Sequence, residues 1–203
     1  MRLYTLKKRL LPFICRYLKV NRTDVYHKLK NLAIGISLWK DDKDFLYGAL
    51  RQIQLANIFF PRWRLRLFIP INIPNRKNLL VPENLIMKMK SLGAEISYVD
   101  MKDINIPLNL ISLLILEEKE IEYFIIREAR QRFSECDLEE FNNFVTSNKS
   151  AHYIKSSNNK TQLFLSEMWE GNSQKLRTKL NFNQTSGKQF VQVIRILQLI
   201  TYN

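Results

Sequence analysis

The chain has 203 residues, 46% of them hydrophobic and 11% aromatic, and 32 Lys and Arg against 19 Asp and Glu give a formal net charge of +13. This length suits one domain or one domain with a small addition, and the apolar content excludes a disordered or low-complexity protein. Five Gly and two Cys exclude a collagen-like repeat, a disulfide framework and a zinc ribbon, since each needs many copies of one residue at fixed spacing.

Residues 1–31 are basic and partly apolar, which predicts an N-terminal helical segment. Arg16 ends the apolar run 10–15 after six residues, too few for a signal peptide, and no apolar stretch approaches the roughly 20 residues of a membrane span. A solvated helix with one apolar face and an amphipathic helix on an anionic membrane surface both fit this pattern. We expect a cytoplasmic protein without a transmembrane segment, with peripheral membrane contact as an alternative.

Strands and helices are predicted to alternate from residue 32 to residue 154. The first strand, 32–38, is an apolar run typical of a strand buried on both faces, and helix 45–60 has helical apolar spacing with Asp44 as its expected N-cap. The remaining predicted strands are 64–71, 94–99, 121–126 and 151–154, and the remaining helices are 82–92, 107–118 and 135–145. This alternation predicts an α/β, Rossmann-like fold with a mostly parallel central sheet and helices on both faces.

Ligands of open parallel sheets bind at the carboxyl ends of the strands. The segments to consider are therefore 37–44, 69–75, 99–103 and 127–134. None of them contains a G-x-G-x-x-G or a P-loop pattern, so the ordinary dinucleotide and P-loop functions lose their main support.

Several ordered stretches carry a family likeness. They are ISLWKDDKDFLYGALRQIQLANIFFPRW at 36–63, MKMKSLGAEISYVDM at 87–101, IEYFIIREARQRF at 121–133 with the His-bearing strand that follows, and Met168-Trp169-x-Gly171. Together they resemble nucleotide-sugar-dependent glycosyltransferase-like proteins of the GT-A type. The resemblance implies a transferase-like domain over 32–171, followed by a divergent, polar segment 172–203 with a possible helix at 190–200, and hence a divergent and shortened member.

The same resemblance implies a site for a nucleotide-diphosphate sugar and a divalent cation, Mn or Mg. The implied donor-binding residues are Ser37, Leu38, Trp39, Arg127, Glu128, Arg130, Arg132 and Trp169. In that family an Asp-x-Asp pair holds the cation, because a hard cation prefers carboxylate oxygens and neutralises the leaving diphosphate. Here the position is Glu128-Ala129-Arg130, so Glu128 is the one candidate metal ligand and a guanidinium replaces the second carboxylate. We expect reduced or absent metal-dependent transfer, and no catalytic residue is assigned.

Each of these residues also has a structural interpretation. Glu128 could pair with a neighbouring Arg, Arg130 and Arg132 could be solvated charges, and Trp169 could be a core or loop anchor as well as a stacking surface. The acidic group Asp41, Asp42 and Asp44 could bind a cation, but the intervening lysines favour a solvated loop.

The positive charge permits a function of another class, a basic module that binds nucleic acid or an anionic membrane surface. Such a module needs a contiguous basic face. The candidate basic groups are Arg62, Arg64 and Arg66 on one strand and the arginines 127, 130 and 132 at the end of another.

Overall fold

The computed structural model describes residues 29–77, 79–102, 104, 106–154 and 168–179. The chain divides into two units, Met1–Lys30 and Asn31–Asn203, and the fold below is that of the second. The predicted N-terminal helical segment and the predicted helix at 190–200 lie outside the described residues.

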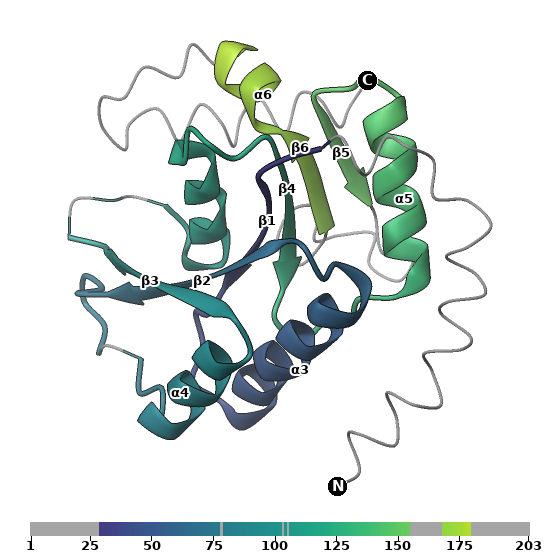
Figure 1. The fold of residues 1–203 in the computed structure, drawn as a ribbon. Coiled ribbons are helices and arrows are strands. Elements are labelled where there is room, and N and C mark those ends of the chain that lie inside the picture. Colours follow the sequence, from purple (N-terminus) through teal and green to yellow (C-terminus); the bar gives the residue numbers. More distant parts are fainter. Residues whose placement is uncertain (1–28, 78, 103, 105, 155–167, 180–203) are drawn as a thin grey trace, which may run out of the picture. The chain divides into compact units, whose positions relative to one another are not determined.

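Strands and helices alternate through most of the second unit (Figure 1). The strands are β1 (Leu32–Ser37), β2 (Arg64–Ile71), β3 (Ala94–Asp100), β4 (Tyr123–Glu128), β5 (Ala151–Ile154) and β6 (Met168–Asn172). The helices are α3 (Lys43–Phe59), α4 (Glu83–Ser91), the 3-10 helix η1 (Leu108–Glu117), α5 (Glu135–Thr146) and α6 (Ser173–Lys179).

The six strands form one sheet in the order β3-β2-β1-β4-β6-β5. The pairs β1–β2, β1–β4 and β2–β3 are parallel, whereas β6 runs antiparallel to both β4 and β5. The predicted α/β fold with a mostly parallel sheet is therefore confirmed.

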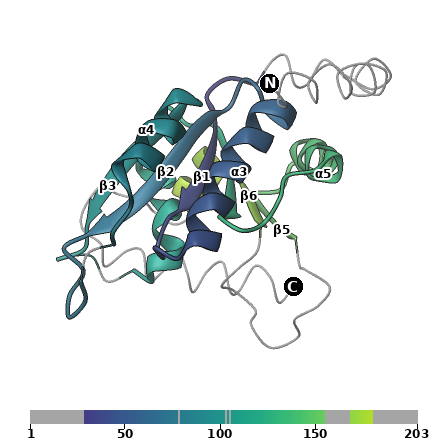
Figure 2. The ribbon, with the colours of Figure 1, turned by 90° about the horizontal axis from the view of Figure 1, so that it is seen from below.

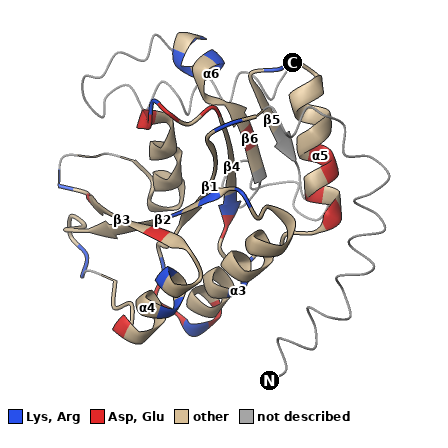
Figure 3. Cartoon of the chain, in the orientation of Figure 1, with Lys and Arg blue, Asp and Glu red and all other residues tan. Residues whose placement is uncertain are grey.

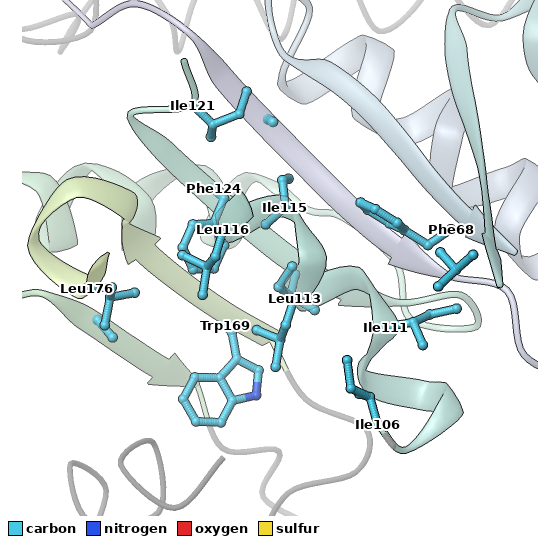
Figure 4. Close-up of a cluster of buried hydrophobic side chains, with 14 of the residues drawn as sticks. Phe68, Ile106, Ile111, Leu113, Ile115, Leu116, Ile121, Phe124, Trp169 and Leu176 are labelled. Carbon is cyan, nitrogen blue, oxygen red and sulfur yellow. The ribbon is translucent and has the colours of Figure 1, made fainter. Parts of the chain in front are cut away.

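One face of the sheet is covered by η1 and α6. The η1 sequence LNLISLLILE is apolar at most positions, so several of its sides can be buried at once. Its side chains pack with Phe124, Trp169 and Leu176 in a single hydrophobic cluster (Figure 4).

The other face is covered by α3, α4 and α5. Figure 2 shows α3 and α4 side by side over the strands, and buried Phe45, Ala49 and Ile53 line the sheet side of α3. Helix α5 packs through Phe141, and the centroids of the Phe141 and Trp63 rings are 4.6 Å apart. Helices lie on both faces, as predicted.

Helix α3 and strand β4 begin at other residues than predicted. Helix α3 is capped by Asp42 rather than Asp44: the Phe45 amide donates to Asp42 Oδ1 at 2.8 Å, and Asp44 lies in the first turn, where its charge complements the helix dipole. Strand β4 begins two residues later than predicted, because pairing with β1 starts at Tyr123 while Ile121 packs in the cluster below the strand.

Strand β6 and helix α6 were not predicted as elements. They continue the sheet and the core past residue 171, because Leu176 is 1% exposed and joins the same hydrophobic cluster. In the part of the chain that the structure describes, no helix combines the length and apolarity needed to cross a bilayer.

Candidate functional site

The order of the strands reverses between β1 and β4. From β1 the chain continues outward through β2 and β3, and it then returns to place β4 on the opposite side of β1. In open α/β sheets such a switch point, at the carboxyl ends of the strands, is where ligands bind. Ser37 and Glu128 are register partners there, so the two segments predicted to bind a donor do lie side by side.

The first two residues predicted in the β1 segment have structural partners. The Ser37 hydroxyl donates to Ser112 Oγ at 2.8 Å and accepts from the Ser112 amide at 2.9 Å, which ties η1 to β1. Leu38 is fully buried and its amide donates to the Phe68 carbonyl at 2.8 Å. Side-chain contacts of this segment with a ligand would therefore begin at Trp39.

Trp39 and Lys40 form the half-buried part of the β1 edge. The Trp39 and Phe45 rings pack edge to face with their centroids 5.5 Å apart, and Lys40 Nζ lies 4.5 Å from the centre of the indole. Sequence analysis did not select Lys40 or Phe45, because the contacts that unite them with the site are tertiary. The next two carboxylates are engaged, since Asp42 caps α3 and Asp41 accepts from the Leu80 amide at 3.3 Å.

Arg127 is buried at the end of β4. Its guanidinium forms an ion pair with Asp137 of α5, donates to the Arg132 carbonyl at 3.2 Å and lies 5.2 Å from the centre of the Phe133 ring. Burial lowers the pKa of Arg127, and the facing carboxylate of Asp137 opposes that change. Arg127 therefore holds the β4–α5 loop and is enclosed by it.

The β4–α5 loop is held at three more points. A Cβ atom on Gly48 would lie only 3.0 Å from the Ala129 carbonyl oxygen, so the absence of a side chain lets α3 approach the loop. The Phe133 amide donates to Gln52 Oε1 at 3.3 Å. Ser134 and Asp137 then form a capping box that starts α5.

Glu128 is the last residue of β4, and Arg130 and Arg132 lie on this loop. Glu128 Oε1 accepts from Arg130 Nε at 3.0 Å and its Oε2 accepts from the Arg130 amide at 3.3 Å. Arg132 Nη1 donates to the carbonyls of Arg130 and Gln131 at 2.5 and 2.9 Å. Arg130 also lies 6.0 Å from the centre of the Phe45 ring, so Phe45 contacts both Trp39 and Arg130 and connects the two edge segments.

Trp169 lies away from this edge. It is 5% exposed and packs in the hydrophobic cluster beneath η1 (Figure 4). Its ring therefore serves the core, and the structure does not bring it together with Trp39 or Arg130.

A polar pair on β5 and β6, in which only Glu170 is fully buried, was missed by sequence analysis. Glu170 is 0% exposed, and its Oε2 lies 3.3 Å from His152 Nδ1. Burial raises the pKa of Glu170 to about 8 and lowers the pKa of His152. Burial thus disfavours the charged form of both partners in this contact.

The residues described do not fit the divalent cation implied by the resemblance. Such a cation is held by one or two carboxylates together with the phosphates of the ligand, and Glu128 is the one carboxylate at the position of the pair. Glu128 is also paired with the cationic Arg130, whose charge repels a metal ion.

The basic residues among those described in the second unit are distributed over several elements (Figure 3). Arg64 and Arg66 of β2 form ion pairs with Glu95, Glu118 and, in the case of Arg64, Glu120. Their charge is therefore neutralised within the fold, and they do not supply the free basic stripe that a nucleic-acid or membrane module needs.

No family model and no curated protein matches the sequence. Among solved structures, the fold is similar to 4-diphosphocytidyl-2C-methyl-D-erythritol synthase from Anaerococcus prevotii, at 10% identity and a TM-score of 0.45 over 82% of this chain and 84% of that chain. A provisionally assigned nucleotide-diphospho-sugar transferase from Desulfovibrio desulfuricans has 10% identity and a TM-score of 0.42, over 82% and 75% of the two chains.

Bifunctional IspDF from Campylobacter jejuni is similar at 9% identity and a TM-score of 0.42, over 82% of this chain and 47% of that one. The chain thus spans about half the length of that protein.

Proposed function

We propose that the chain binds a nucleotide-diphosphate sugar at the carboxyl edge of β1 and β4, and that metal-dependent glycosyl transfer to an acceptor is reduced or absent. The observation that carries the proposal is the position of the two segments predicted to bind the donor. They adjoin at the switch point of the sheet, with Ser37 opposite Glu128. The sequence resemblance to glycosyltransferases supplies the class of ligand.

The charges at this edge suit a diphosphate. Lys40 and Arg130 are basic, and each is linked by aromatic contacts to Phe45, through Trp39 in the case of Lys40. Two cations at one edge can neutralise the two phosphoryl groups of a nucleoside diphosphate. Trp39 is partly exposed and offers a ring face for a base or a sugar.

Reduced catalysis follows from the state of Glu128. Both of its carboxylate oxygens accept hydrogen bonds from Arg130, so a proton or a metal ion at Glu128 would have to compete with the guanidinium beside it. Transfer breaks the bond between the sugar and the diphosphate, and the leaving diphosphate must then be stabilised by the basic residues alone.

Calorimetric titration with uridine- and guanosine-diphosphate sugars tests the proposal. We expect one sugar nucleotide to bind with a Kd between about 1 μM and 1 mM, the ordinary range for substrates. Trp39→Ala should weaken that binding severalfold, whereas Tyr47→Ala, which truncates an exposed ring on α3, should leave it unchanged. Absence of binding by both nucleotides would remove the donor function, and rapid manganese-dependent release of the nucleoside diphosphate would overturn the claim of reduced catalysis.

A further inference from the structure

Glu128 is bound twice by a single residue. The Nε and the amide of Arg130 donate to its two oxygens at 3.0 and 3.3 Å, and the Glu128 side chain is only 10% exposed. A divalent cation at Glu128 would have to displace the guanidinium or bind next to its positive charge, and both are unfavourable. The carboxylate therefore acts as an acceptor for Arg130.

The same hydrogen bond leaves the other edge of the guanidinium for a ligand. Only Nε of the Arg130 side chain donates to Glu128, and among the described residues nothing accepts from its Nη1 or Nη2. The Arg130 side chain is 54% exposed. Two parallel N–H groups on one planar edge match the spacing of two phosphate oxygens.

The neighbouring arginines are held by different contacts. Arg127 is enclosed with Asp137, and Arg132 Nη1 is engaged by two loop carbonyls. Phe45 adds a fixed surface beside Arg130, since the ring is fully buried and the Phe45 amide is held by the cap of α3. The guanidinium thus lies between a carboxylate and an aromatic ring, with one polar edge outward.

We infer that Arg130, oriented by Glu128, binds the diphosphate directly and takes over the charge-neutralising role of a divalent cation, so that binding is independent of metal. This inference rests on the proposed function and specifies how its diphosphate is recognised. Arg130 is the binding residue, and Glu128 is its positioning residue.

The metal dependence of ligand binding and the effect of substituting Arg130 distinguish direct binding by Arg130 from a metal site. Uridine diphosphate, guanosine diphosphate and inorganic pyrophosphate are titrated into the full chain with EDTA or with manganese. We expect a Kd that differs less than twofold between the two conditions for the ligand that binds. Arg130→Ala should weaken binding at least tenfold and Arg130→Lys severalfold, because an ammonium lacks the two-pronged edge. The control Arg51→Ala removes an equal charge from the exposed side of α3 and should change the Kd less than twofold.

Glu128→Gln is expected to change affinity in opposite directions if Glu128 positions Arg130 and if Glu128 is a metal ligand. Glutamine keeps an oxygen that accepts from Arg130 Nε and removes a negative charge near the phosphate, so affinity should be unchanged or rise up to about fivefold. A metal ligand would lose manganese-dependent affinity on the same change. Thermal melting of each variant verifies folding, and the Arg130 variants still decide the question if Glu128→Gln does not fold.

The outcomes also separate the inference from the proposed function. Binding that requires manganese, or that survives Arg130→Ala, overturns direct recognition by Arg130 and leaves the donor site standing. Absence of binding by all three probes in both conditions overturns the donor site and the inference together.

Discussion

Gly48 is the residue at which helix α3 adjoins the loop that carries Arg130. A Cβ atom there would lie 3.0 Å from the Ala129 carbonyl oxygen and 3.2 Å from Arg130 Cα. Both are backbone atoms, which cannot rotate away as a side chain does. The close approach of helix and loop therefore depends on the missing side chain.

Gly48→Ala is expected to separate stability from binding. Alanine favours the helix by up to about 1 kcal/mol relative to glycine, and the displacement of the loop opposes that gain. The free energy of unfolding should therefore change by less than about 1 kcal/mol, while nucleoside diphosphate affinity falls severalfold because Arg130 moves with the loop. Urea unfolding and calorimetry measure the two effects, and unchanged affinity would show that the loop position does not matter for binding.

The positions of the two edge segments were predictable from sequence, whereas the contacts of their side chains were not. The segments ending at Ser37 and Glu128 follow from strand pattern and resemblance, and they do adjoin. The role of Ser37 depends on Ser112, which lies 75 residues away in the chain, and the burial of Trp169 depends on η1. No local pattern contains such contacts.

At the scale of elements, α6 secures the end of η1. Arg177 Nη1 donates to the carbonyls of Leu116 and Glu118 at 3.1 and 3.0 Å, and Nη2 donates to those of Lys119 and Ile121 at 3.2 Å each. The last carbonyls of a helix lack partners within it. One guanidinium thus satisfies four carbonyls around the η1–β4 connection.

Arg177→Ala should lower the free energy of unfolding by about 2–3 kcal/mol, because charge-assisted hydrogen bonds to partly buried carbonyls are lost together. Arg177→Lys should recover less than half of the loss, since an ammonium cannot reach four acceptors. Lys179→Ala removes an exposed charge from the same helix and should change stability by no more than about 0.5 kcal/mol. Equal urea midpoints for Arg177→Ala and Lys179→Ala would contradict this role.

Elements with strong periodicity were predictable, and those stabilised mainly by tertiary contacts were not. Helix α3 has seven buried positions at helical spacing, whereas α6 has a single buried apolar side chain, Leu176. Strand β6, MWEGN, includes a glutamate and a glycine, which are unfavourable in strands. Its place in the sheet comes from pairing with β4 and β5.

At the scale of the whole molecule, the stability of the fold is coupled to protons through Glu170. The carboxyl group on β6 faces His152 of β5, Arg127 of β4, and Asp137 and Glu140 of α5. Burial is the main cause of its raised pKa of about 8, the charges of Glu140 and Asp137 add to it, and Arg127 opposes it.

Glu170 and His152 make the free energy of unfolding depend on pH in opposite directions. Between about pH 4.5 and 8 the native state keeps the Glu170 proton that the unfolded chain has lost, so the free energy of unfolding falls as the pH rises. Burial lowers the pKa of His152, so the unfolded chain takes up a proton first and stability falls as the pH drops below about 6.5. In mildly acidic solution the contributions of Glu170 and His152 to the pH dependence of stability oppose one another. Above pH 7 the contribution of Glu170 dominates.

Glu170→Gln isolates the effect of the carboxyl group, because an amide can still donate to His152 Nδ1 but cannot ionise. From pH 7 to pH 9 the wild type should lose about 1–2 kcal/mol of unfolding free energy relative to this variant, since each pH unit of differential protonation is worth about 1.4 kcal/mol. Urea unfolding at both pH values measures the difference, in which the other titrating groups cancel. Glu139→Gln, which removes an exposed carboxylate from α5, should follow the wild-type profile. Parallel profiles for the wild type and Glu170→Gln would show that Glu170 is already ionised in the native state at pH 7 and that the polar cluster compensates its burial.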